Sequence, residues 1–149
     1  MRFFSDHTSS IAFAEIEAAL KADDSAYRIV ELDRDAADLF DCADLYYGDD
    51  AYARIEINRP GERLFHAEIQ EHVEAVDYDG EGQTARVIDT LRNANAIIRV
   101  HVLWGGRDSD LTLSRLQPLW QWLFLVRSGV LQADSEGYYD EDDIIVEAS

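Results

Sequence analysis

The sequence predicts one globular domain over residues 1–149, of the α+β class, in which a mostly antiparallel or mixed sheet of four to five strands is covered by about four helices in a two-layer arrangement. Three observations lead to this prediction. The length of 149 residues fits one domain. The hydrophobic content of 47% is typical of a globular fold. Strand-like and helical patterns of apolar residues also follow one another along the chain, which permits some parallel pairing.

Five segments have the composition or the alternation of strands. Arg2–Phe4 is a short apolar start, expected at an edge of the sheet. Ala51–Asn58 alternates between apolar and polar residues, which is typical of a sheet with one face in water. Ala96–Trp104 is apolar at both parities, which favours a central strand. The other two are Tyr27–Leu32 and Ile144–Val146, the latter as a short strand packed within the acidic C-terminal segment 134–149.

Apolar residues at spacings of three and four predict the helices. Ser10–Ala22 begins at capping residues, and Leu64–Val76 carries a stripe of phenylalanine, isoleucine and valine. A third helix includes Val87 to Ala94. A short helix over the core is expected within Asp33–Asp50, through the residues Leu39, Phe40, Ala43 and Tyr47.

The stretch Leu111–Gln132 is the most apolar part of the chain and predicts the central packing helix. Apolar residues occupy nearly its whole circumference, so the helix must be covered on more than one side. Pro118 either kinks one long helix or lies in the first turn of a helix that restarts there. Gly129 is a candidate for the end of the helix. The side chains of Trp120 and Trp122 are expected in the core.

The formal net charge of −18 restricts the partners that this protein can have. Asp33–Asp50 contributes −6, and Asp134–Glu147 contributes −7. Direct binding of nucleic acid is disfavoured because phosphate contacts need clustered lysine and arginine. Binding to an anionic membrane surface is disfavoured for the same reason. A basic protein partner is permitted.

No catalytic residue, cofactor or metal is assigned from the sequence. The nucleophile-elbow, phosphate-loop and dinucleotide motifs do not occur. The single cysteine, Cys42, excludes an internal disulfide and a cysteine zinc cluster. The acidic runs favour a solvated surface over a metal site, since their spacing does not match a calcium loop. The members of these runs are Asp33, Asp35, Asp38 and Asp41, and then Asp140, Glu141, Asp142 and Asp143.

Two sets of residues are candidates for binding. Arg99 and His101 share one face of their predicted strand, and Arg54 and Glu56 join them if Ala51–Asn58 is the neighbouring strand. This polar patch is either a site or an internal arginine–glutamate pair on a semi-buried face. The second set consists of tyrosines in the two acidic segments, which suit recognition of a positive surface or pack with their rings inward. They are Tyr46, Tyr47, Tyr138 and Tyr139.

The leading functional hypothesis is a small acidic cytoplasmic protein that acts by protein–protein interaction. An inhibitor or immunity-type protein directed at a basic toxin or nuclease fits its charge. The cytoplasmic assignment follows from the lone cysteine and the expected lack of a secretory signal. One alternative is a small-molecule enzyme or binder that uses the polar patch. Another is a domain that self-associates as a homo-oligomer, with an acidity that reflects solubility or adaptation to high salt.

Overall fold

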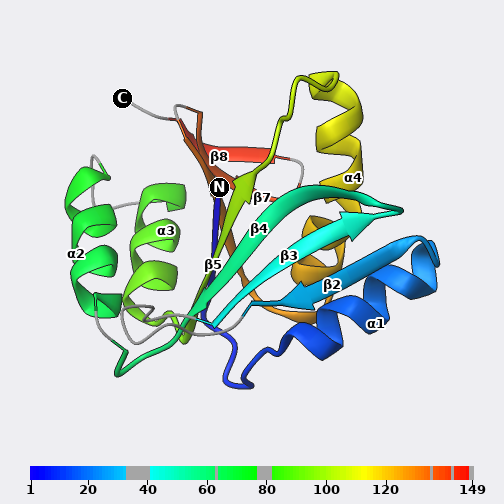
Figure 1. The fold of residues 1–149 in the computed structure, drawn as a ribbon. Coiled ribbons are helices and arrows are strands. Elements are labelled where there is room, and N and C mark those ends of the chain that lie inside the picture. The colour runs from blue at the N-terminus through cyan, green and yellow to red at the C-terminus, as the bar shows by residue number, and fades with distance from the viewer. Residues whose placement is uncertain (33–40, 63, 77–81, 135, 142, 148–149) are drawn as a thin grey trace.

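The chain is built on one large antiparallel sheet. A computed structural model describes residues 1–32, 41–62, 64–76, 82–134, 136–141 and 143–147, and within these ranges it contains eight strands and four helices (Figure 1). The strand order across the sheet is β2-β3-β4-β5-β1-β6-β7-β8. The strands are β1 (Arg2–Ser5), β2 (Tyr27–Glu31), β3 (Asp41–Tyr47), β4 (Asp50–Asn58), β5 (Ala96–Val102), β6 (Gly129–Ala133), β7 (Gly137–Asp140) and β8 (Asp143–Glu147). The helices are α1 (Phe13–Asp23), α2 (Phe65–Ala75), α3 (Gly82–Arg92) and α4 (Ser109–Val126).

Strand β1 lies inside the sheet, between β5 and β6, so the expectation of an edge strand at Arg2–Phe4 is wrong. Phe3 is paired with Ile98 on one side and with Leu131 on the other. Both Phe3 and Phe4 are fully buried, which suits an interior strand that is apolar on both faces. Strand β5 pairs with β4 and β1, so the predicted interior position of this strand is confirmed.

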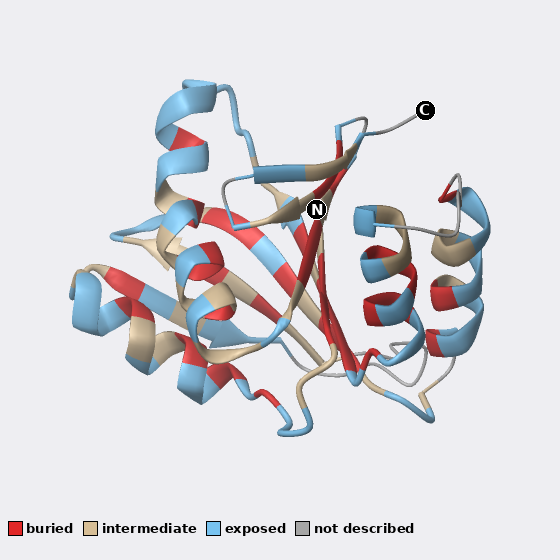
Figure 2. Cartoon of the chain, turned by 180° about the vertical axis from the view of Figure 1, so that it is seen from behind, coloured by how far each residue is buried: buried red, intermediate tan, exposed pale blue. Residues whose placement is uncertain are grey.

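Helices cover both faces of the sheet, which corrects the predicted two-layer arrangement. Phe3 and Ile98 belong to one buried cluster together with side chains of α1 and α4. Their neighbours Phe4 and Ile97 point to the opposite face and pack with α2 and α3. Figure 2 shows the buried residues in the middle strands and on the helix sides turned toward the sheet. The reason is that β1 and β5 are apolar on both faces, and a single layer of helices would leave one face in water.

The predicted count of four to five strands is also wrong, and the first missing strand is β3. A short helix was expected here, whereas Asp41–Tyr47 pairs along its whole length with β4 and from Ala43 onward with β2. Ala43 and Leu45 alternate into the core and are fully buried. The remainder of the acidic segment, residues 33–40, lies outside the described residues. Strand pairing on both sides therefore overrides the weak helical spacing of this segment.

The other missing strands, β6 and β7, follow the central helix. Helix α4 ends at Val126, and β6 begins at Gly129, within the stretch that was assigned to the helix. A Cβ atom on Gly129 would collide with the carbonyl oxygen of Phe4. Glycine is thus required here by the close approach of β6 to β1, and it does not act as a helix cap. Strand β7 then joins β6 to the last strand, which is slightly longer than predicted.

Helix α4 is continuous through Pro118. The side chain of Asp108 accepts a hydrogen bond from the amide of Leu111, at 3.0 Å, and caps the start of the helix. The buried side chains of α4 include Leu116, Trp120 and Leu123. None of the helices in the described ranges is long and apolar enough to cross a membrane.

Candidate functional site

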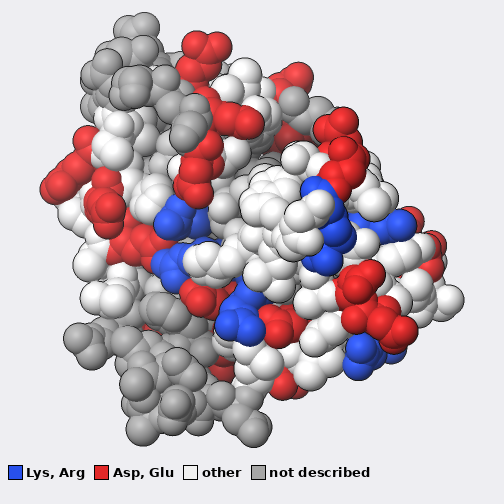
Figure 3. Space-filling model, turned by 45° about the horizontal axis from the view of Figure 1, so that its top comes forward, with Lys and Arg blue, Asp and Glu red and all other residues white. Residues whose placement is uncertain are grey.

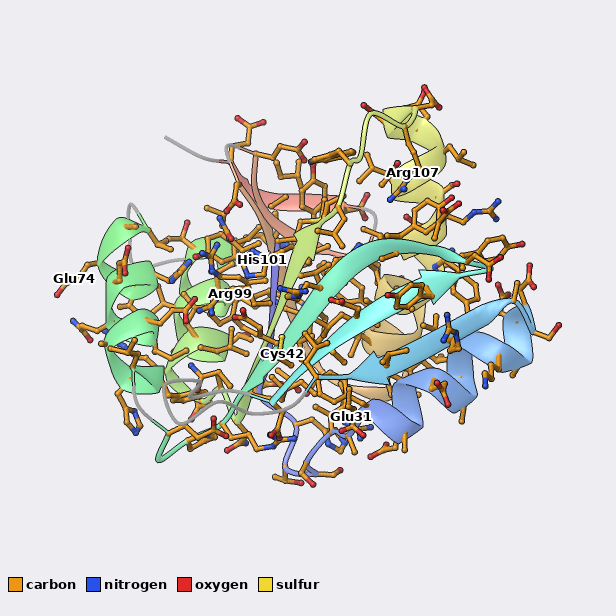
Figure 4. All side chains as sticks on the ribbon, in the orientation of Figure 1. Glu31, Cys42, Glu74, Arg99, His101 and Arg107 are labelled. Carbon is orange, nitrogen blue, oxygen red and sulfur yellow. The ribbon has the colours of Figure 1, made fainter. Side chains whose placement is uncertain are left out.

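The four residues of the predicted polar patch lie together on one face of the sheet. Strands β4 and β5 are neighbours, and their register places Glu56 opposite Arg99 and Arg54 opposite His101. The alternation of both strands turns these side chains away from the core shared by α1 and α4. Figure 4 shows Arg99 and His101 on β5, on the side toward α2 and α3. The spatial grouping that the strand alternation predicted is therefore present.

Within the patch, Arg99 is tied to two carboxylates. Its Nη1 donates to Oε2 of Glu56 at 2.8 Å, and its Nη2 donates to Oε2 of Glu68 on α2. Glu68 also accepts a hydrogen bond of 2.8 Å from Nε of Arg2. The side chains of Arg99 and Glu68 are only 17% and 11% exposed. Burial opposes ionisation of Glu68 most strongly, but hydrogen bonds from Arg99 and Arg2 outweigh it and hold its pKa below the usual value.

The outer part of the patch is paired in the same way. Arg54 donates two hydrogen bonds to Asp44 on β3, of 2.9 and 3.2 Å. His101 is 53% exposed, and its Nε2 lies 3.6 Å from Oε1 of Glu56. Figure 3 shows basic and acidic side chains next to one another on this side of the molecule. Since carboxylates already neutralise these arginines, the patch is best explained as an ion-pair network that satisfies a semi-buried face.

A cavity of about 280 Å³ lies beside this network, between α2 and the sheet. Charged groups dominate its lining. The carboxylate of Glu68 already binds Arg2 and Arg99 in its wall, so neither guanidinium group is left without a counter-charge for a ligand. The lining residues are Arg2, Leu64, Ala67, Glu68, Glu71, His72 and Arg99.

The predicted tyrosines do not form one surface, because four strands separate β3 from β7. On β3, the ring of Tyr46 lies under the guanidinium group of Arg28, at 4.6 Å. Tyr47 donates a hydrogen bond of 2.6 Å to Oδ2 of Asp24 and stacks against Arg115 at 3.7 Å. These contacts engage both rings within the protein.

The tyrosines of β7 differ from each other. Tyr138 is buried against Phe4, and this burial raises the pKa of Tyr138 to about 12. Tyr139 points to the other face, where its hydroxyl donates a hydrogen bond of 2.6 Å to Oε2 of Glu136. A hydroxyl held by a carboxylate at the surface is accessible to a partner. Tyr139 is therefore the predicted tyrosine that suits a binding surface best.

Tyr139 lines an apolar groove between α4 and strands β6 and β7. The groove has a volume of about 490 Å³, within the range of protein binding sites. Carboxylate and amide side chains border a mainly apolar surface. The lining residues are Met1, Leu113, Gln117, Trp120, Gln121, Phe124, Leu125, Leu131, Ala133, Glu136, Tyr139 and Glu141.

The central stretch was predicted to be core throughout, and the structure divides it into a buried and an exposed side. Trp120 is 7% exposed, so its predicted place in the core is confirmed. Leu125 is 83% exposed, and Leu113 is also exposed. The sequence indicated that a helix apolar nearly all round must be covered on more than one side, but it did not indicate which side would be exposed. Among the described residues, the side of α4 that carries Leu113 and Leu125 is exposed.

The acidic runs fall partly outside the described residues. This applies to Asp33, Asp35, Asp38 and Asp142. Asp41 forms an ion pair with Arg59, and Asp140 forms one of 2.7 Å with Arg86. In the ranges that the structure covers, no three His, Cys, Asp or Glu side chains are gathered as metal ligands.

Of the two surfaces, the polar patch is internally paired and the groove on α4 is open. The groove combines exposed apolar side chains with carboxylates at its border, which makes it complementary in charge and polarity to a ligand that is apolar in part and positive in part. Comparison of the chain with protein-family models, with curated proteins and with solved structures finds no match.

Proposed function

We propose that this protein is an interaction module that binds a basic protein partner in the groove between α4 and strands β6 and β7. The observation that carries the proposal is Leu125, a large apolar side chain that is 83% exposed in a groove also lined by Glu136 and Glu141. An inhibitor or immunity-type role against a basic enzyme or toxin agrees with this chemistry. The partner would insert apolar side chains and place its cations at the border.

The apolar side chains of the groove would provide most of the binding free energy when a partner covers them. Fully burying a leucine contributes about 1.5–3 kcal/mol. Phe124 and Tyr139 stand on either side of the same groove, and aromatic side chains in such positions commonly contribute much of the binding energy. A partner side chain that covers Leu125 and contacts both rings would therefore act as the centre of the interface.

The charge of the protein supplies attraction over a longer distance. With a net charge of −18, the protein accelerates the approach of a cationic partner and repels a second copy of itself. Salt screens such attraction over about 10 Å at 0.1 M ionic strength. Association with the partner should accordingly slow as salt is added.

Two matched variants of α4 test the proposal. Leu125→Ala removes the exposed anchor, while Leu111→Ala removes an exposed leucine of the same helix that does not line the groove. Alanine keeps the helix stable in both cases. A partner captured from native lysate would be purified, and its affinity for both variants would be measured calorimetrically at about 50 and about 500 mM salt.

We expect Leu125→Ala to weaken binding about tenfold, and Leu111→Ala to leave it within about twofold. Affinity should fall at the higher salt concentration. An acidic partner, salt-insensitive binding, or equal losses in the two variants would overturn the proposal.

A further inference from the structure

Strand β8 forms one edge of the sheet and offers backbone groups for pairing. It is paired with β7 on one side, and no strand pairs with its other side in the described part of the chain. Asp143, Ile144 and Glu147 are exposed, and the exposed fraction of Ile144 is 41%. An edge of this kind can take up an additional strand, because its outer N–H and C=O groups are unpaired.

The opposite edge of the sheet, β2, is protected in a way that β8 is not. The amide of Ile29 on β2 donates a hydrogen bond of 2.7 Å to Oε2 of Glu17, which reaches over from α1. That bond occupies one amide of β2 and opposes strand addition there. No side chain among the described residues caps an amide of β8 in the same way. The two edges therefore differ in their capacity to accept a strand.

Charge determines which strand β8 can accept. Asp140, Glu141, Asp143 and Glu147 lie on β8 or on the adjacent turn and strand. The pairing of β8 with β7 shifts register between Tyr138 and Tyr139, which puts Asp143 and Glu147 on opposite faces of β8. An antiparallel pair of two copies would therefore bring carboxylates together along both faces of this short edge, and their repulsion opposes self-association. A strand with basic residues at these positions would form opposite-charge pairs instead.

We infer that β8 is a strand-addition site for an extended basic segment of a protein partner. The inference rests on the proposed function, because it assumes the same basic partner. It also extends that function, since Ile144 is paired with Tyr139 and therefore points to the side of the groove. An added strand would direct alternate side chains toward Leu125 and Tyr139. Backbone pairing would provide affinity, and the groove would select the side chains.

Synthetic peptides added to the full chain test the site. The probe is a capped peptide of about nine residues in which lysine and valine alternate. The control is the same peptide N-methylated at two adjacent central residues, which removes an amide donor from each edge of the strand while keeping the charge. A third peptide replaces lysine by glutamate. Affinity is measured by calorimetry, and bound sites are located by hydrogen exchange.

We expect the lysine peptide to slow exchange of the amides in 143–147 by about fivefold or more. The N-methylated and acidic peptides should bind about tenfold more weakly or worse. The variant Asp143→Asn with Glu147→Gln should weaken binding of the lysine peptide. Its charge-matched control, Asp49→Asn with Asp50→Asn at the exposed end of the β3–β4 hairpin, should not.

Equal binding of the N-methylated peptide, protection elsewhere than β8, or no binding at all would overturn strand addition. These outcomes can be distinguished from the outcomes that would overturn the groove proposal. If Leu125→Ala weakens binding of the natural partner while β8 remains unprotected in that complex, only strand addition fails. If β8 is protected and Leu125→Ala has no effect, only the groove proposal fails.

Discussion

Arg2 and Arg99 lie directly opposite each other on strands β1 and β5, and both point to the same face of the sheet. Like charges in this position repel each other. Glu68 of α2 accepts hydrogen bonds from both guanidinium groups and removes the conflict. One carboxylate thus fixes α2 onto the two innermost strands, and its ionisation becomes a condition for the stability of the sheet.

Replacing this carboxylate should make the protein less stable at neutral pH. We expect Glu68→Gln to lower the free energy of unfolding by about 1–3 kcal/mol, because two arginines lose a charged acceptor. The control Glu74→Gln changes an exposed residue of the same helix and should have little effect. Urea unfolding at pH 7 provides the measurement, and equal stability of the two variants would contradict the assigned role.

The same carboxylate should make stability depend on pH in the acid range. The pKa of Glu68 is lower in the folded state than its ordinary value, so the folded protein holds fewer protons at this group than the unfolded chain. The resulting stability is complete above the unfolded pKa of about 4.3 and is lost as the pH falls through the lower folded value. Urea unfolding from pH 7 downward should show Glu68→Gln converging on the wild type. A constant gap at all pH values would argue against this mechanism.

The raised pKa of Tyr138 predicts that the protein loses stability at alkaline pH. This pKa is raised to about 12 by burial, whereas an exposed tyrosine ionises near pH 10. The folded state therefore keeps its proton longer than the unfolded state, and stability should fall as the pH rises from about 10 toward 12. Tyr138→Phe should reduce this fall, as measured by unfolding at several pH values. Ionisation of Tyr138 near pH 10 in the folded protein, followed by ultraviolet absorbance, would contradict the prediction.

Gly129 lies so close to Phe4 that a larger side chain at this position should destabilise the protein. Gly129→Ala should destabilise the protein by about 3 kcal/mol, at the upper end of overpacking costs, because the obstacle is a backbone oxygen. Gly106→Ala serves as the comparison. A Cβ atom there would meet no neighbouring atom, so the left-handed backbone conformation of Gly106 is the one cost of the substitution. That strain costs about 1–2 kcal/mol. Thermal unfolding of both variants should rank Gly129→Ala as the less stable.

The charge of the protein predicts its state of assembly. We expect a monomer of 16.9 kDa at about 50 mM salt, because two copies with the same net charge of −18 repel each other. Light scattering coupled to size exclusion measures the mass. A stable dimer at this salt concentration would instead support self-association through the exposed side of α4.

The spacing of apolar residues within one segment was sufficient to predict those helices and strands whose structure depends mainly on their own sequence. The spacing of apolar residues identified α1 and α2, and the alternation of Ala51–Asn58 identified β4. The same alternation brought Arg54 and Glu56 to the face of Arg99, because side-chain direction in a strand has a fixed period of two.

What the sequence left open depends on contacts between distant segments. Strand β3 exists because β2 and β4 supply partners, and its own spacing suggested a helix. Strand β6 requires Gly129 to pass close to Phe4, a neighbour more than one hundred residues away in the chain. The position of the groove was open as well, because the exposure of Leu125 depends on which side of α4 packs against the sheet.

The interior position of β1 has a consequence for how the protein folds. Phe3 and Phe4 are synthesised long before their partners, which lie on β5 (Ala96–Val102) and β6 (Gly129–Ala133). The middle of the sheet therefore cannot close until most of the protein has been synthesised. Contacts between such distant segments slow folding and leave unpaired strands exposed for longer. During synthesis, β1 lacks its partner β6 until residues 129–133 have been added.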